Sequence, residues 1–111
     1  AIQSAISGVL VSDPIKEYIV ALVEATRKND DVELGVSTRG MLSMLRACQA
    51  YAAIHGRDYV LPDDVKALAV PVFAHRLILK VKYNSANKAS EIISRLLGTI
   101  PAPTESTTQK L

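Results

Sequence analysis

The chain has 111 residues, a formal net charge of +2, 49% hydrophobic residues and only 5% aromatic residues. These values fit one small domain with a mostly aliphatic core. The charge is too small to favour nucleic acid or a membrane surface as a partner. The single cysteine excludes an internal disulfide, and no apolar run is long enough to span a bilayer. Because the start of the chain lacks a signal-peptide pattern, we expect a cytoplasmic protein that does not insert into a membrane.

The first predicted helix begins at Ser12-Asp13-Pro14 and ends near Arg27-Lys28. Ser12 or Asp13 can cap it, and proline suits the first turn, where its missing N–H costs nothing. The turn-prone run Asn29-Asp30-Asp31 follows. The expected buried stripe, at helical spacing, consists of Ile15, Tyr18, Ile19, Leu22, Val23 and Thr26.

The second predicted helix, from Thr38 to His55, is apolar over much of its circumference, which is typical of a central helix packed on two or more sides. Ser37 should cap its start, and Gly56 should form its left-handed C-terminal cap. One expected apolar line consists of Met41, Leu45, Cys48 and Ala52, and the other of Met44, Ala47, Tyr51 and Ile54. A thiol at Cys48, among apolar residues, should be buried and inert.

Two short segments are expected to be extended. Arg57–Val60 can pair with Val9–Val11 as a two-stranded patch, which would be stable only under a cover of helices. Leu77–Tyr83 alternates between apolar and polar residues and therefore predicts a strand.

Two more helices complete the predicted bundle. The third starts at Pro62-Asp63-Asp64, with proline in the first turn and two carboxylates that complement the helix dipole. Pro71 lies inside its pattern and should kink or restart it. The fourth runs from Lys88 to Leu97 and should end at Gly98.

The predicted fold class is therefore mainly α, a small bundle of about four helices with a short two-stranded β patch. Residues 1–100 should form this domain, and residues 101–111 a disordered polar tail.

Arg39 is the residue whose placement needs explaining. A cation in the first turn of a helix lies against the positive end of the helix dipole. One explanation is an anion held at that helix end by the arginine and the dipole together. The alternative is an arginine that reaches back to Glu33 or Asp31 in a weak surface pair.

No catalytic machinery is visible in the sequence. There is no phosphate-binding loop of the GxxxxGK[ST] or GxGxxG type, and the two histidines lack metal-ligand spacing with the one cysteine. Asp30-Asp31 is interpreted as a turn and Asp63-Asp64 as a helix start, while His55 and His75 complement helix ends. We therefore expect that this chain alone is not an enzyme.

Two classes of function remain on this evidence. One is a helical module that completes a site elsewhere, with Arg39 as its reaching residue, or a stand-alone helical protein-interaction module. The other is a nucleic-acid binder of the helix-turn-helix type. The second is disfavoured because the helix best placed for recognition carries little positive charge beyond Arg39 and Arg46.

A linked series of short motifs resembles the C-terminal lid subdomain of MoxR-type AAA+ ATPases over about residues 2–100. The series consists of Val11-Ser12-Asp13, Tyr18-Ile19-Val20, Ala25-Thr26-Arg27, Gly35–Arg39, Gly56–Val60, Pro62–Val65 and His75-Arg76-Leu77. The usual family sequence Gly-Ala-Ser-Pro-Arg-Ala reads Gly35-Val36-Ser37-Thr38-Arg39-Gly40 here. Thr38 in place of proline and Gly40 in place of alanine should loosen the helix start.

The resemblance implies a role for Arg39. It resembles the sensor II arginine of AAA+ proteins, which reaches the γ-phosphate of ATP bound by a separate core, with Ser37 and Thr38 supporting the helix start. It further implies ATP and Mg²⁺ as cofactors of the parent protein, with Mg²⁺ bound by an N-terminal AAA+ core. The implied partners are that core, neighbouring subunits of a ring, and a client of a chaperone-like maturation factor.

Overall fold

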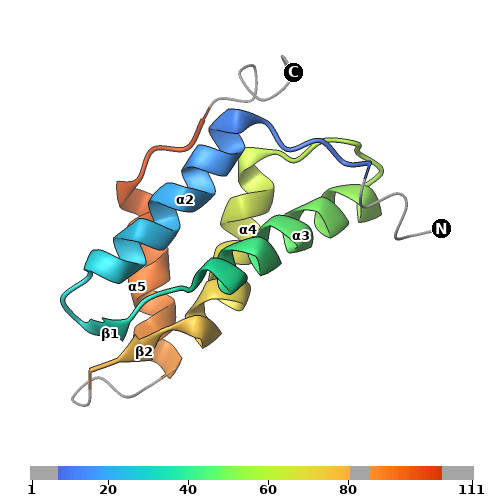
Figure 1. The fold of residues 1–111 in the computed structure, drawn as a ribbon. Coiled ribbons are helices and arrows are strands. Elements are labelled where there is room, and N and C mark those ends of the chain that lie inside the picture. Colours follow the sequence, from blue (N-terminus) through green and yellow to red (C-terminus); the bar gives the residue numbers. More distant parts are fainter. Residues whose placement is uncertain (1–7, 81–85, 104–111) are drawn as a thin grey trace.

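The structure is a computed structural model that describes residues 8–80 and 86–103. Over these residues the chain forms four α-helices, a 3₁₀ turn and one two-stranded sheet, so the predicted fold class is confirmed. The elements in chain order are α2 (Asp13–Lys28), β1 (Val32–Leu34), α3 (Thr38–Ile54), α4 (Pro62–Phe73), η1 (Ala74–Arg76), β2 (Ile78–Leu79) and α5 (Ala86–Thr99). Figure 1 shows the sheet at one end of the helical bundle, where the chain passes from α2 through β1 into α3.

Helix α2 follows its predicted pattern. The Ser12 Oγ accepts a hydrogen bond from the backbone N–H of Ile15 at 3.4 Å and so caps the first turn. All six residues of the expected stripe are buried. Burial of each large apolar side chain stabilises the fold by about 1.5–3 kcal/mol, so this stripe fixes which face of α2 meets the other helices.

Helix α3 is central, but it is buried along one line only. It packs mainly against α4 and also against α2, and its buried residues are Gly40, Met44, Cys48 and Ala52. Met41 and Leu45, from the first expected line, are half-buried. In the second expected line only Met44 is buried, and Ile54 is 81% exposed. That part of the prediction is wrong because the far side of α3 has no neighbouring helix among the described residues.

The ends of α3 are as predicted. His55 is the C-terminal cap residue, and its backbone N–H donates to the carbonyls of Tyr51 and Ala52. Gly56 follows with φ +75°, the left-handed conformation expected of it.

One of the two effects predicted for Pro71, a restart of the helix, does not occur, and neither does the predicted helix end at Gly98. Helix α4 continues through Pro71 to Phe73 and then tightens into η1, so Pro71 does not restart the helix. Helix α5 continues through Gly98 to Thr99, because the N–H of Ile100 still donates to the carbonyl of Leu96 at 2.9 Å. Pro101 has no N–H to continue this ladder, so the helix ends there and not at the glycine.

The β patch consists of other residues than predicted. Strands β1 and β2 pair antiparallel, with Val32 opposite Leu79 and Leu34 opposite Ile78. The predicted partners, Val9–Val11 and Arg57–Val60, form a single parallel bridge between Leu10 and Tyr59 instead of a sheet. Strand β1 is Val32-Glu33-Leu34, which alternates between apolar and polar residues but is too short for that pattern to have revealed it.

Parts of two further predictions lie outside the described residues. The second half of the predicted strand Leu77–Tyr83, beyond Lys80, is one of them, and residues 104–111 of the predicted disordered tail are the other. In the described part of the predicted tail, Ala102 packs against the core.

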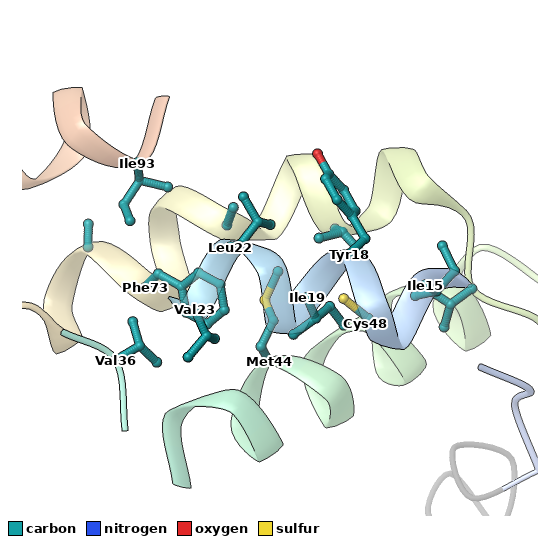
Figure 2. Packing of buried hydrophobic residues seen from close by; sticks show 14 of the residues in the cluster. Ile15, Tyr18, Ile19, Leu22, Val23, Val36, Met44, Cys48, Phe73 and Ile93 are labelled. Atoms are coloured by element: carbon teal, nitrogen blue, oxygen red, sulfur yellow. The ribbon is translucent and has the colours of Figure 1, made fainter. Parts of the chain in front are cut away.

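The core is aliphatic, as the composition predicted. It takes side chains from all four helices and includes one phenylalanine, Phe73, which is fully buried. Figure 2 shows Val36, just ahead of α3, at the same end of this cluster as Phe73 and Val23. The segment that leads into α3 is therefore anchored in the core by an apolar side chain.

An ion pair between half-buried Arg57 and buried Asp64 holds the segment between α3 and α4. The Asp64 side chain is 3% exposed and accepts two hydrogen bonds from Arg57, from Nη2 to Oδ1 at 2.7 Å and from Nη1 to Oδ2 at 2.8 Å. Asp64 Oδ2 also accepts from the N–H of Leu61 at 2.8 Å, which caps α4. This pairing explains why the motifs around Gly56–Val60 and Pro62–Val65 occur together.

We expect Asp64→Ala to lower the free energy of unfolding by about 3 kcal/mol, because it removes the buried partner of an ion pair and a helix cap. Asp63→Ala is the matched control. Its carboxylate is exposed and complements only the helix dipole, so the loss should be below about 1 kcal/mol. Urea unfolding of the two variants checks this, and equal losses would contradict a special role for Asp64.

Candidate functional site

The candidate site is the start of helix α3. Ser37 is extended, with φ −80° and ψ 168°, and its Oγ accepts a hydrogen bond from the N–H of Gly40 at 3.1 Å. The Ser37 carbonyl accepts the first intrahelical bond, from the N–H of Met41 at 3.0 Å. The predicted cap is therefore present. Thr38 and Arg39 follow in the first turn, and both are exposed.

The Arg39 side chain takes no part in a hydrogen bond or an ion pair with any residue that the structure describes. The expected alternative partners do not reach it: Asp31 pairs with Lys88 at 3.7 Å, and no contact joins Arg39 to Glu33. The first turn of α3 also contains no acidic residue. The guanidinium thus faces solvent at the positive end of a helix.

The segment before the cap is held by two residues at the end of α2. The N–H of Val36 donates to Thr26 Oγ1 at 3.1 Å, and Arg27 Nε donates to the Val36 carbonyl at 2.9 Å. Both polar groups of the Val36 backbone are thereby satisfied by side chains. The sequence placed Thr26 only in the buried stripe, and Ala25-Thr26-Arg27 only in the resemblance, so these bonds were missed. The signal available in the sequence was Thr26 itself, because a hydroxyl in a mostly apolar buried stripe needs a hydrogen-bond partner.

Two positions in this segment accept only glycine without rearrangement, because a Cβ there would lie too close to neighbouring atoms. A Cβ on Gly35 would lie 2.8 Å from the backbone of Arg27. A Cβ on Gly40 would lie 2.8 Å from Val36 Cγ1 and 3.0 Å from Arg76 Cδ. Gly40 was expected to loosen the start of α3, but it is buried and lets Val36 and Arg76 pack closely against the first turn.

This arrangement fits the binding of a phosphate group. Backbone N–H groups in the first turn of a helix have no intrahelical partner, and together with the dipole they favour an anion. An arginine adds a planar, permanently charged donor that matches phosphate oxygens. The described residues therefore provide hydrogen-bond donors and positive charge for one phosphate group that approaches from solvent.

The other titratable candidates are structural. The His55 ring packs on Tyr51, with 4.3 Å between ring centroids, and His55 Nδ1 lies 2.8 Å from the Tyr51 carbonyl oxygen. Burial, and secondarily the charge of Asp64, raises the pKa of Cys48 to about 12, so this thiol stays protonated at neutral pH. In residues 8–80 and 86–103 no group of three or more His, Cys, Asp and Glu side chains could hold a metal ion.

Arg57, in the segment between α3 and α4, is taken up by its internal pair with Asp64. Asp58, His75 and Arg76 are exposed. None of the described helices is long and apolar enough to cross a membrane.

Comparison with known proteins identifies the domain. Residues 24–96 match the model of the AAA lid domain. The chain is 39% identical over 106 residues to YeaC, an uncharacterized protein of Bacillus subtilis, and 36% identical over 112 residues to the protein MoxR of Paracoccus denitrificans. It is also 32% identical over 112 residues to the chaperone MoxR1 of Mycobacterium tuberculosis. These alignments cover 94%, 87% and 92% of this chain.

A solved structure agrees with these relatives. The crystal structure of a candidate ATPase from Cytophaga hutchinsonii superposes with a TM-score of 0.82 at 29% identity, covering 92% of this chain and 34% of that one. The chain spans about a third of the length of the curated relatives it matches, from 30% to 33% in the three named here.

The chain therefore belongs to the AAA lid domain family. Within that family it is the C-terminal lid of a MoxR-family AAA+ protein, as its resemblance predicted.

We expect Gly40→Ala to destabilise the domain by about 1–3 kcal/mol, because its Cβ would overpack Val36. Helix propensity alone predicts the opposite sign, a gain of about 1 kcal/mol. The double variant Val36→Ala with Gly40→Ala restores the usual family residues at both positions and should be more stable than Gly40→Ala alone. Urea unfolding of both variants tests this, and a stabilised Gly40→Ala variant would show that the contact is not limiting.

Proposed function

We propose that this lid closes over ATP bound to a separate AAA+ core and presents Arg39 to the γ-phosphate, as a sensor II arginine. The observation that carries the proposal is an exposed arginine with no partner among the described residues, in the first turn of a capped helix. Its position runs against the helix dipole, and an anion at the same helix end removes that conflict. Ser37 supports this role by capping the first turn, which begins at Thr38.

The same contact couples hydrolysis to movement of the lid. Arg39 stabilises the negative charge on the terminal phosphate by charge-assisted hydrogen bonds. When that phosphate leaves, the contact is lost and the lid is free to rotate. Mg²⁺ would be held by the core and would neutralise charge on the phosphates, while this chain contributes the guanidinium and the helix end.

The parent protein is proposed to be a ring-forming, chaperone-like ATPase of the cytoplasm. Support for the chaperone class comes from the relative named chaperone MoxR1. Support for contacts with other domains comes from a hollow of about 200 Å³ between α2 and α3. The α3 residues that line it begin at Met41, two positions after Arg39. Its lining consists of Lys16, Ile19, Val20, Met41, Leu42 and Leu45, and Leu42 is 52% exposed.

We expect Arg39→Ala in the whole protein to lower ATP turnover about 10- to 100-fold. A hydrogen bond to a charged group contributes about 1.5–3 kcal/mol, and each 1.4 kcal/mol is a factor of ten. The melting temperature should change little, because Arg39 is exposed and makes no bond within the described part of the lid.

Arg46→Ala is the matched control, because Arg46 is a second exposed arginine on α3, seven residues further along. It should keep turnover within about twofold of the wild type, since a surface substitution away from the site changes little. Steady-state ATPase assays and thermal unfolding of both variants test this prediction. Parallel losses of turnover and melting temperature in Arg39→Ala would argue that this arginine is structural.

A further inference from the structure

We propose that Thr26 and Arg27, at the C-terminal end of α2, are positioning residues for Arg39. They would act by holding the backbone of Val36, and we call this pair of contacts the Val36 clamp. The inference rests on the proposed function of Arg39 and adds two residues to it. Ala25-Thr26-Arg27 belongs to the motif series, and the fold alone gives it no role in the site.

The Thr26 side of the clamp has a fixed hydrogen-bond direction. Thr26 is fully buried, and its hydroxyl donates its one proton to the Val23 carbonyl at 2.6 Å. The oxygen is then left as an acceptor for the N–H of Val36, at 3.1 Å. The hydroxyl therefore joins the last turn of α2 to the segment before α3.

The Arg27 side of the clamp depends on the close approach of the Gly35 backbone to Arg27. Arg27 Nε donates to the Val36 carbonyl at 2.9 Å. A Cβ on Gly35 would lie 2.8 Å from Arg27 Cγ as well as from its backbone, so the missing side chain lets the two segments touch. Arg27 is exposed but, unlike Arg39, its guanidinium is committed to a backbone contact.

The clamp lies one residue before the cap that starts α3. Val36 is held by two hydrogen bonds and a buried side chain, Ser37 caps the helix through the N–H of Gly40, and Arg39 lies between Ser37 and Gly40 in the sequence. The start of α3, and with it the base of the Arg39 side chain, is thereby fixed relative to α2. Because a misplacement of about 1 Å can cost a catalytic contact about a hundredfold in rate, loss of the clamp should act through Arg39.

The test is a double-mutant cycle for ATP turnover in the whole protein. Thr26→Val keeps the shape of the side chain and removes the hydroxyl, and Thr26→Ser keeps the hydroxyl. With Arg39 present, Thr26→Val should lower kcat about tenfold, and Thr26→Ser should stay within about twofold. In an Arg39→Ala background, Thr26→Val should change kcat by no more than about twofold, because the group that it positions is already gone.

A second cycle covers the case in which Thr26→Val does not fold. Arg27→Met keeps the apolar stem of this exposed residue and removes the Nε donor, and the neighbouring Lys28→Met removes the same charge without touching Val36. Arg27→Met should lower kcat about tenfold only when Arg39 is present, and Lys28→Met should leave kcat unchanged in both backgrounds. If Thr26 and Arg27 were merely structural, their variants would have a lower melting temperature, but their effect on kcat would not depend on whether Arg39 is present.

Two outcomes overturn the proposal, and they are distinguishable. If the clamp variants lower kcat by the same factor with and without Arg39, the clamp does not act through this arginine, although the role of Arg39 stands. If Arg39→Ala itself leaves turnover unchanged, the proposed sensor role fails and the positioning role fails with it.

Discussion

The orientation of α3 relative to α2 and α4 is determined by one line of residues along the helix. Gly40, Met44, Cys48 and Ala52 recur every fourth residue and are the buried residues of the helix, so α3 can meet α2 and α4 in one orientation only. This orientation also determines where the two ends of α3 lie. The N-terminal end carries Arg39, and the C-terminal end leads through Gly56 to the Arg57–Asp64 pair.

The exposed position of Arg39 is a consequence of the same orientation. The Gly40 side of the first turn is turned inward, and the adjacent position faces solvent with no acidic neighbour in that turn. Among the described residues, the buried carboxylate of Asp64 is compensated by Arg57. Arg39 is left without such compensation at the helix end that already carries positive partial charge, which is why the site is suited to an anion supplied from outside the domain.

The sequence allowed the helices and their caps to be predicted because these depend on local chemistry. Ser12 and Ser37 cap, Gly56 is left-handed, and the stripe of α2 is buried as its spacing indicated. Features that depend on distant parts of the chain could not be predicted in this way. Strand β1 exists because β2 lies beside it, and the contacts of Val36 with Thr26 and Arg27 join residues nine and ten positions apart. The proposed role of Arg39 came from the resemblance, and only the structure showed that its side chain has no partner among the described residues.

The contact between Val36 and the first turn of α3 also makes two sequence positions depend on each other. The usual family residues at positions 36 and 40 are both alanine, whereas this chain has the larger valine and the smaller glycine, and the added Cγ1 lies 2.8 Å from where the lost Cβ would be. A chain with valine and alanine together would be overpacked, while one with alanine and glycine would contain only a small void. Positions 36 and 40 are therefore coupled in this chain, because the valine at position 36 fits only beside a residue that lacks a Cβ at position 40.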